Sequence, residues 1–221
     1  MALDSIAYQV VGSSDNALTA FRANSLDIAT VSGDQVANAM ADPDVSQALE
    51  VTGAGFLWYL TFSQTDRNAA GGKLANANPR LAISNAIDRE SLMDNYVMDG
   101  SLATYAAVPP QFAASATTGE DFSGGQEMFA DHIGYDVDRA TKFFEDAKKE
   151  LGTDTFTMIY GNNEGDEVEK AAQAIKEQAE KNLPGITLNL QPMTKAERLD
   201  RMLHDDFDVA HTRWDSTTPT P

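Results

Sequence analysis

Hydrophobic residues recur along this chain at two different spacings, in segments that alternate with one another. Segments with alternating apolar and polar residues are typical of half-buried strands, whereas apolar residues spaced three and four apart are typical of helices that cover a core. The strand pattern occurs at residues 6–11, 26–31, 51–52, 56–63, 156–160, 186–190 and 207–210. The helical pattern occurs at residues 15–23, 34–41, 78–87, 88–96, 136–151, 166–183 and from 194 onward. Strands that alternate with helices predict an α/β domain, a mixed β-sheet flanked by helices.

Helix starts are predicted from polar side chains that can accept hydrogen bonds from the free N–H groups of a first turn. These expected caps are Asp15, Asn78, Asp88 and Asp136, with capping boxes at Asp166–Glu169 and Thr194–Glu197. Residues 99–135 are rich in small side chains and predict a long loop. A loop of that length usually forms a binding surface or wraps around a core.

Charge and composition exclude several functions. The 221 residues carry 16 basic and 34 acidic side chains, a net charge of −18, which argues against binding nucleic acid. The chain has no cysteine, so disulfides, thiolate catalysis and thiolate metal sites are excluded. No apolar run approaches the ~20 residues of a membrane span, and no signal peptide is recognisable. We therefore expect a cytosolic protein or a fragment of a larger secreted one.

The residues give no sign of catalysis. The three histidines, His132, His204 and His211, lack metal-ligand spacing, and we expect them at the surface. Acidic clusters such as Asp205-Asp206 lack the spacing of a calcium loop. No nucleophile elbow, phosphate-binding loop or dinucleotide fingerprint occurs, which disfavours a hydrolase or transferase domain. We predict no enzyme activity, no cofactor and no bound metal.

Several short segments occur in an order that is specific to one family. They are Leu26-Asp27-Ile28-Ala29, Leu81–Ile83, Ala86-Ile87-Asp88-Arg89-Glu90, Lys181-Asn182-Leu183 with Gly185-Ile186, and Phe207-Asp208-Val209 ending at Trp214. In this order they resemble the extracellular peptide-binding proteins of ABC importers, the oligopeptide, dipeptide and nickel solute-binding group. The resemblance covers nearly the whole chain but only about half of the family's length.

The resemblance implies a fold and a set of partners. The chain is similar to the second lobe, inserted into the first, of a two-lobed periplasmic-binding-protein-like fold (type II, cluster C). Residues 1–221 would then be a single ligand-binding lobe cut from a longer chain. Its partners would be a peptide or other small solute, the first lobe of the same parent protein and an ABC permease. The parent would lie in the periplasm or at the extracellular face of the membrane, lipid-anchored in a Gram-positive host. Strands 6–11 and 207–210 would then lie close together in one sheet.

The same resemblance indicates candidate ligand-binding residues at two places. Trp214 is either a core aromatic or a cleft residue, and Arg213 beside it could hold a peptide carboxylate or form a surface ion pair. Asn162 and Asn163 follow a predicted strand and resemble a loop that touches the ligand backbone, although they are also ordinary turn residues.

One departure from the family concerns the ligand's amino group. Peptide-binding members carry an Asp three positions after the tryptophan, where this chain has the neutral Thr217. Asp215 is the nearest carboxylate and could take over that role. The neutral residue favours the alternative of a non-peptide ligand, such as a nickel chelate or a sugar. A structural interaction module is a separate alternative.

Overall fold

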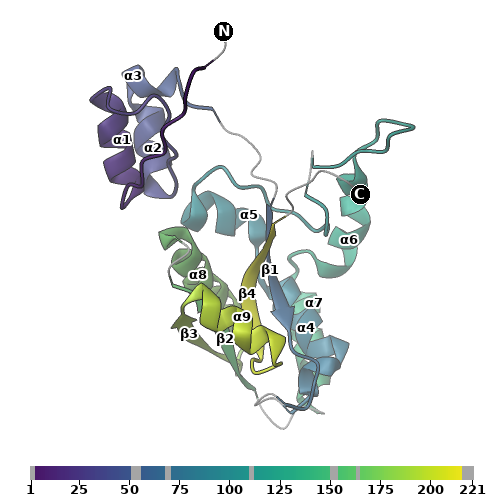
Figure 1. Cartoon of the computed structure of the whole chain (residues 1–221). Helices are drawn as coiled ribbons and strands as arrows, with labels where there is room; N and C mark the ends of the chain where they lie inside the picture. Colours follow the sequence, from purple (N-terminus) through teal and green to yellow (C-terminus); the bar gives the residue numbers. More distant parts are fainter. Residues whose placement is uncertain are drawn as a thin grey trace. The chain divides into compact units, whose positions relative to one another are not determined.

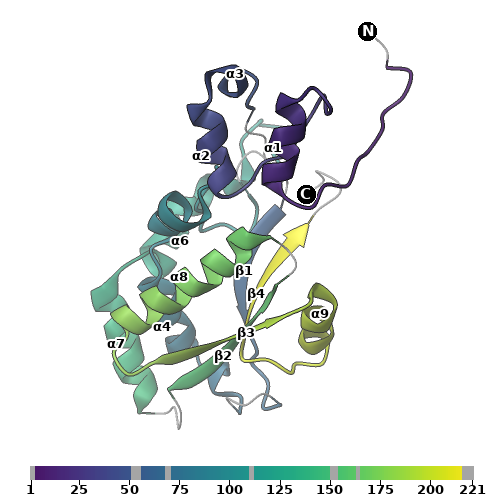
Figure 2. The same ribbon diagram turned by 90° about the vertical axis from the view of Figure 1, so that its left-hand side faces the viewer.

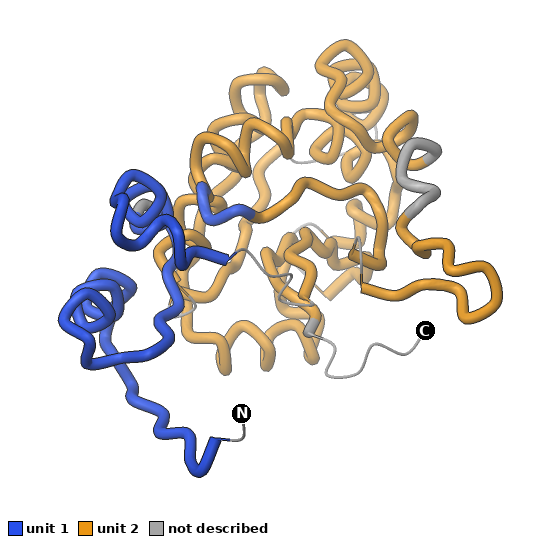
Figure 3. Tube along the Cα trace, turned by 90° about the horizontal axis from the view of Figure 1, so that it is seen from above, with its two compact units in different colours: residues 1–51, 98–100 blue, residues 52–97, 101–221 orange. Residues whose placement is uncertain are grey.

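A computed structural model of the chain describes residues 3–50, 56–67, 71–109, 112–149, 154–162 and 165–215, with Asp34, residues 124–128 and Asp215 described for their backbone only. The chain divides into two compact units, each coloured separately in Figure 3. Unit 1 comprises residues 1–51 and 98–100, and unit 2 comprises residues 52–97 and 101–221.

Unit 1 is helical. Its helices are α1 (Ser14–Arg22), α2 (Asp34–Ala41) and α3 (Pro43–Ser46). Leu18, Ala39 and Val45 form its small core, against which three partly buried apolar side chains pack. The prediction of a strand at 26–31 is wrong, and so is the prediction at 6–11.

Alternating apolar residues make a strand only where a neighbouring strand completes the hydrogen-bond ladder. No ladder in the described part of the chain includes residues 6–11, so the prediction that they share a sheet with 207–210 is wrong. Ile6, Tyr8 and Val10 are instead exposed, as is Ile28 in the second segment. The predicted strand at 51–52 lies outside the described residues.

Unit 2 is built on a mixed four-stranded sheet in the order β1-β4-β2-β3 (Figure 1). The strands are β1 (Phe56–Phe62), β2 (Thr155–Gly161), β3 (Thr187–Met193) and β4 (Val209–Asp215). β4 is antiparallel to β1 and parallel to β2, and β2 is parallel to β3. The predicted α/β class with a mixed sheet is confirmed.

Helices cover both faces of this sheet (Figure 2). They are α4 (Ala77–Ala86), α5 (Arg89–Leu92), α6 (Gln126–Ile133), α7 (Val137–Lys148), α8 (Asp166–Asn182) and α9 (Lys195–Leu203). Single turns at Lys73–Ala75 and Phe122–Gly125 are 3₁₀-helical, and Met93–Val97 is a π-helix. The main core lies between one face and helices α4, α7 and α8, while α9 packs on the other face.

Three of the predicted caps are confirmed. The side chains of Asp88, Asp136 and Thr194 each accept a hydrogen bond from a backbone N–H three residues ahead. In each case the capping residue has an extended backbone and stands directly before the first helical residue.

The remaining caps are displaced from their predicted positions. Ser13 rather than Asp15 caps α1, and Asn76 rather than Asn78 caps α4. Helix α8 starts after Gly165 without a side-chain cap, so the predicted capping box at Asp166 is wrong. Asp15 and Asp166 lie inside the first turn instead, where a carboxylate favours the helix dipole without capping it. The 99–135 segment is not a loop throughout, because it contains α6.

The Ala-Ile-Asp-Arg motif holds a corner of the helical layer together. Arg89 donates to the backbone carbonyls of Ser84 and Ile133, at 3.3 and 3.1 Å, and to the Ser84 hydroxyl at 2.9 Å. Asn182, from another motif segment, donates to the carbonyl of Ala86 at 2.8 Å. The carbonyls of Ser84 and Ala86 lie in the last turn of α4, and that of Ile133 ends α6. Carbonyls at these positions have no partner within their own helix, so the motif residues supply the missing donors.

Candidate ligand-binding surface

The sheet of unit 2 divides into two ribbons at the carboxyl end of β4. β1 and β4 pair along their whole length, as do β2 and β3. β2 and β4, which join the two ribbons, pair only at Met158–Val209 and Ile159–Ala210. Past Ala210 the backbone groups that β4 directs toward β2 therefore need other partners.

Asp208 fastens the start of β4 to both neighbouring strands. Its carboxylate Oδ2 accepts a hydrogen bond from the N–H of Thr157 at 2.9 Å. Its backbone carbonyl accepts from the N–H of Ser63, just after β1, also at 2.9 Å. The Phe-Asp motif therefore has a structural role, since it fixes the place where the two ribbons meet.

Arg198 of α9 occupies the place where β2 and β4 separate. Its side chain is buried, and Nη1 donates to the backbone carbonyl of His211 at 3.2 Å. Carbonyls alternate in direction along a strand, and that of Asp208 faces β1, so the carbonyl of His211 faces β2. The guanidinium thus satisfies a carbonyl that β2 no longer reaches.

His211 is buried beside this arginine, so the prediction that all histidines lie at the surface is wrong for it. Burial, followed by the positive charge of Arg198, lowers the pKa of His211 to about 4. Its ring packs against the ring of Trp58, with centroids 5.0 Å apart. His132 and His204 are exposed, as expected.

Arg213 and Trp214 lie on opposite faces of β4, because successive side chains of a strand alternate. The Arg213 guanidinium lies over the ring of Phe56, 4.9 Å from its centroid, and 5.6 Å from that of Trp58. Trp214 is 69% exposed, so its interpretation as a core aromatic is wrong. The backbone of Asp215 pairs with Phe56, which places it on the face of Arg213.

Asn162 belongs to the ribbon formed by β2 and β3. It follows β2, its side chain is exposed, and its N–H donates to the carbonyl of Met193 at 2.8 Å. Since β2 and β4 run parallel, Asn162 and the end of β4 lie at the same edge of the sheet. Asn163 and Thr217 lie outside the described residues.

Sequence reasoning missed Phe56 and Trp58 as partners of Arg213. Phe56 and Trp58 are two positions apart in a predicted strand, so the sequence could have placed both side chains on one face of that strand. The antiparallel register that pairs Trp58 with Arg213 joins residues far apart in the chain, and no local pattern encodes it.

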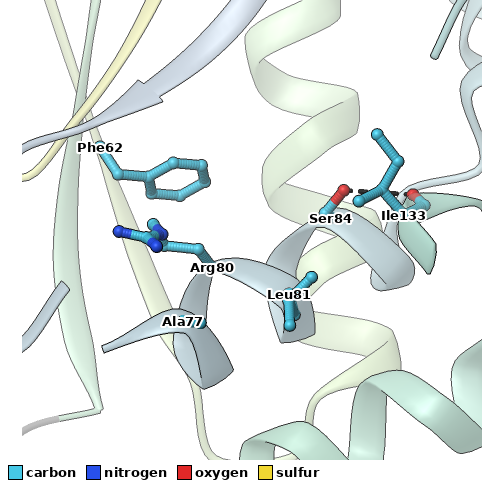
Figure 4. Close-up of a pocket in the computed structure, with 6 residues that line it drawn as sticks. All are labelled: Phe62, Ala77, Arg80, Leu81, Ser84 and Ile133. Atoms are coloured by element: carbon cyan, nitrogen blue, oxygen red, sulfur yellow. Dashed lines mark hydrogen bonds between the residues drawn. The ribbon is translucent and has the colours of Figure 1, made fainter. Parts of the chain in front are cut away.

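A separate depression lies at the Phe62 end of β1, the end away from Phe56 and Arg213 (Figure 4). It has a volume of about 290 Å³ and is lined by Phe62, Ala77, Arg80, Leu81, Ser84 and Ile133. The Ser84 hydroxyl donates to the carbonyl of Ile133 at its rim. None of the predicted ligand-binding residues lines this depression.

No cluster of His, Asp and Glu side chains that could hold a metal ion occurs within the described ranges. None of the helices in that part of the chain is long and apolar enough to cross a membrane. Within these ranges, unit 2 is an α/β unit with an exposed tryptophan and a stacked arginine at one edge of its sheet.

Comparison with known proteins gives the family. Residues 1–221 match the model for the middle region of the bacterial extracellular solute-binding proteins, family 5. The chain belongs to this family of extracellular solute-binding proteins.

Two curated relatives are similar over most of the chain. The oligopeptide-binding protein OppA of Bacillus subtilis is 28% identical over 166 residues, which are 73% of this chain and 27% of the relative. A dipeptide-binding protein of Lactococcus lactis is 23% identical over 214 residues, which are 95% of this chain and 38% of the relative. The chain therefore spans well under half the length of the curated relatives it matches.

Solved structures agree in fold. Listeria monocytogenes OppA bound to peptide is similar with a TM-score of 0.76 and 28% identity, covering 94% of this chain and 39% of that one. The crystal structure of a peptide-binding protein of a peptide ABC transporter is similar with a TM-score of 0.65 and 31% identity, covering 75% and 70%. The unit 2 sheet and its helices thus belong to the periplasmic-binding-protein type of fold.

Proposed function

We propose that this chain is a ligand-binding lobe of a peptide-binding protein that captures extracellular peptides for an ABC importer. The observation that carries the proposal is Trp214, a large aromatic side chain left 69% exposed at the end of β4. An exposed tryptophan at a strand end offers an apolar surface with little conformational entropy to lose on binding. The similarity to OppA bound to peptide supports a peptide as the occupant of that surface.

The peptide is held between this lobe and a second one supplied by the rest of the parent protein. Closure of two lobes around a ligand creates a surface that a membrane permease can recognise. The parent works in the periplasm or at the extracellular face of the membrane, with a lipid anchor in a Gram-positive host. It performs no chemistry on the ligand and needs no cofactor.

Each candidate residue has a distinct role in this proposal. Arg213 binds a carboxylate of the peptide, and Trp214 packs against its apolar surface. Asn162 and Asn163 donate to or accept from the peptide backbone, since amide side chains can do both. Asp215 pairs with the α-amino group, in place of Thr217, because a desolvated ammonium needs a negative partner.

A non-peptide solute is the second candidate, and the neutral Thr217 favours it. A sugar or a nickel chelate has no free amino group and would not need an acidic partner at that position. The fold and the exposed tryptophan are compatible with either ligand.

Mass spectrometry of the parent protein, purified from its native host, tests the proposal directly. We expect bound peptides, and their release should leave a protein that binds the same peptides again in calorimetry. Trp214→Ala should weaken that binding about tenfold or more. Tyr8→Ala, which removes a still more exposed aromatic side chain in unit 1, serves as the control. A co-purifying sugar or metal chelate, with no peptide, would contradict the peptide proposal.

A further inference from the structure

Within the described residues, the sheet of unit 2 has two edge strands, β1 and β3. The N–H of Ser63, just after β1, donates to the carbonyl of Asp208 on the side of β4. The N–H of Thr187 in β3 donates to the carbonyl of Asp154 on the side of β2. Since backbone groups alternate in direction along a strand, the even-numbered residues of both edge strands face outward, away from the sheet.

The outer edge of β3 is closed by side chains of α8. The outward N–H of Leu188 donates to Oε1 of Glu180 at 2.9 Å. The carbonyl of Leu188 accepts a hydrogen bond from Nζ of Lys176, also at 2.9 Å. Pro192, another outward residue, has no N–H to offer to a further strand. These features are typical of a strand that remains at the edge of its sheet.

The outer edge of β1 has no such closure. Its outward residues are Phe56, Trp58, Leu60 and Phe62, whose backbone N–H and carbonyl groups have no hydrogen-bond partner within the described residues. The strand contains no proline and no charged side chain that would oppose the addition of a further strand. An uncharged strand of 7 residues with one open side is the kind of edge to which another strand adds.

Both faces of β1 are also apolar and incompletely covered. Trp58, Leu60 and Phe62 pack against the main core of unit 2, but each stays partly exposed. Leu57 and Tyr59, on the opposite face of the strand, are half-buried as well. A strand added beside β1 would cover apolar surface on both faces and would give partners to the outward backbone groups.

We propose that, in the parent protein, the outer edge of β1 pairs with a β-strand from the part of the chain outside residues 1–221. The dipeptide-binding protein of Lactococcus lactis and OppA of Listeria monocytogenes extend beyond the matched region by more than half of their length, so a parent of similar size has chain to supply this strand. A permanent partner fits the edge better than a ligand, because an apolar edge left open whenever a ligand dissociates promotes aggregation. The inference goes beyond ligand capture and holds for any solute that the parent binds.

Amide hydrogen exchange of the ligand-free parent protein, followed residue by residue by NMR, tests the pairing. The outward amides of Trp58 and Leu60 should exchange within about tenfold of the rate of the inward amide of Tyr59, because both sides of β1 are then hydrogen-bonded. The matched control is β3, which we expect to remain an edge strand. There the outward amide of Leu190 should exchange at least about 100-fold faster than the inward amide of Asn189.

A photoreactive side chain identifies the partner of β1. The residue p-benzoylphenylalanine, in place of Tyr59, keeps an aromatic ring on the face of β1 away from the main core. Irradiation of the parent protein should cross-link this group to a segment of the same molecule outside residues 1–221, which mass spectrometry locates. The same group in place of the exposed Asn189 of β3 should give no cross-link to that segment.

Each other outcome would overturn the inference. Outward amides of β1 that exchange as fast as that of Leu190 would mean that the edge is open in the parent. Cross-links formed only between two molecules would assign the edge to a second copy, and cross-links formed only within residues 1–221 would mean that this chain covers its own edge. These three results would leave peptide capture intact. Protection that appears only after a peptide mixture is added would make the edge a ligand site instead of a permanent pairing.

Discussion

Acidification should destabilise this protein through His211, and the direction follows from its pKa. Burial and the nearby Arg198 lower that pKa from the usual 6.5 to about 4. The unfolded chain therefore takes up a proton on His211 at a higher pH than the folded protein does. The neutral His211 ring makes its full contribution to the free energy of unfolding above about pH 6.5. That contribution falls as the pH drops and is lost by about pH 4, below which this group causes no further change.

The size of the effect follows from the same shift. One pKa unit corresponds to about 1.4 kcal/mol between the two protonation states. The difference between 6.5 and about 4 thus gives a loss of about 3 kcal/mol. For a domain of marginal stability, that is a large part of the total free energy of unfolding.

Urea denaturation at a series of pH values from about 7.5 to about 4.5 measures most of this loss. His211→Gln removes the titrating group, so its unfolding free energy should fall less steeply with pH than that of the wild type. His204→Gln alters an exposed histidine and should follow the wild-type curve. An NMR titration that places the pKa of His211 near 6.5, or identical slopes for wild type and His211→Gln, would refute the reasoning.

Three further predictions concern the supports of the fold and its binding. Arg89→Ala should lower the free energy of unfolding by about 2–3 kcal/mol in urea titrations, because several acceptors lose a charged donor. As a control, Lys149→Ala changes an exposed side chain and should alter the free energy of unfolding by less than about 0.5 kcal/mol. Asp208→Ala should cost about 1–3 kcal/mol, because the N–H of Thr157 loses its acceptor; an unchanged denaturation midpoint would contradict this. The isolated 221-residue chain should bind no peptide in a mixture more tightly than roughly 0.1 mM by calorimetry, and low-micromolar binding would mean that one lobe suffices.

Local sequence signals predicted the α/β class and most helices of unit 2. Asp88 and Asp136 cap helices as expected, because a cap and its target N–H are three residues apart in the chain. Strands 6–11 and 26–31 were wrongly predicted, since a strand depends on a partner that no local pattern specifies. The same limit applies to Lys176 and Glu180 of α8, which form an ion pair one helical turn apart and also bond to the backbone of Leu188 in β3.

The candidate site was predictable by residue type but not by arrangement. Arg213 and Trp214 are adjacent in the chain, which suggested one shared site, yet the period of two in a strand places them on opposite faces. Asn162 reaches the same sheet edge from the other ribbon, through a parallel pairing that joins residues about fifty positions apart. These relationships depend on register, which is set by packing across the whole sheet.

The short β2–β4 pairing accounts for the unusual polar residues in the interior of unit 2. Buried backbone groups need partners, and where β2 and β4 separate, strand pairing no longer supplies them. Asp208 provides an acceptor on one side of the junction, and Arg198 provides a donor on the other. The charge of Arg198 then adds to burial in keeping His211 neutral, and a neutral His211 can pack against Trp58 beside the positive Arg213. The division of the sheet into two ribbons therefore determines both which polar residues the core must contain and how the arginine at the candidate site is supported.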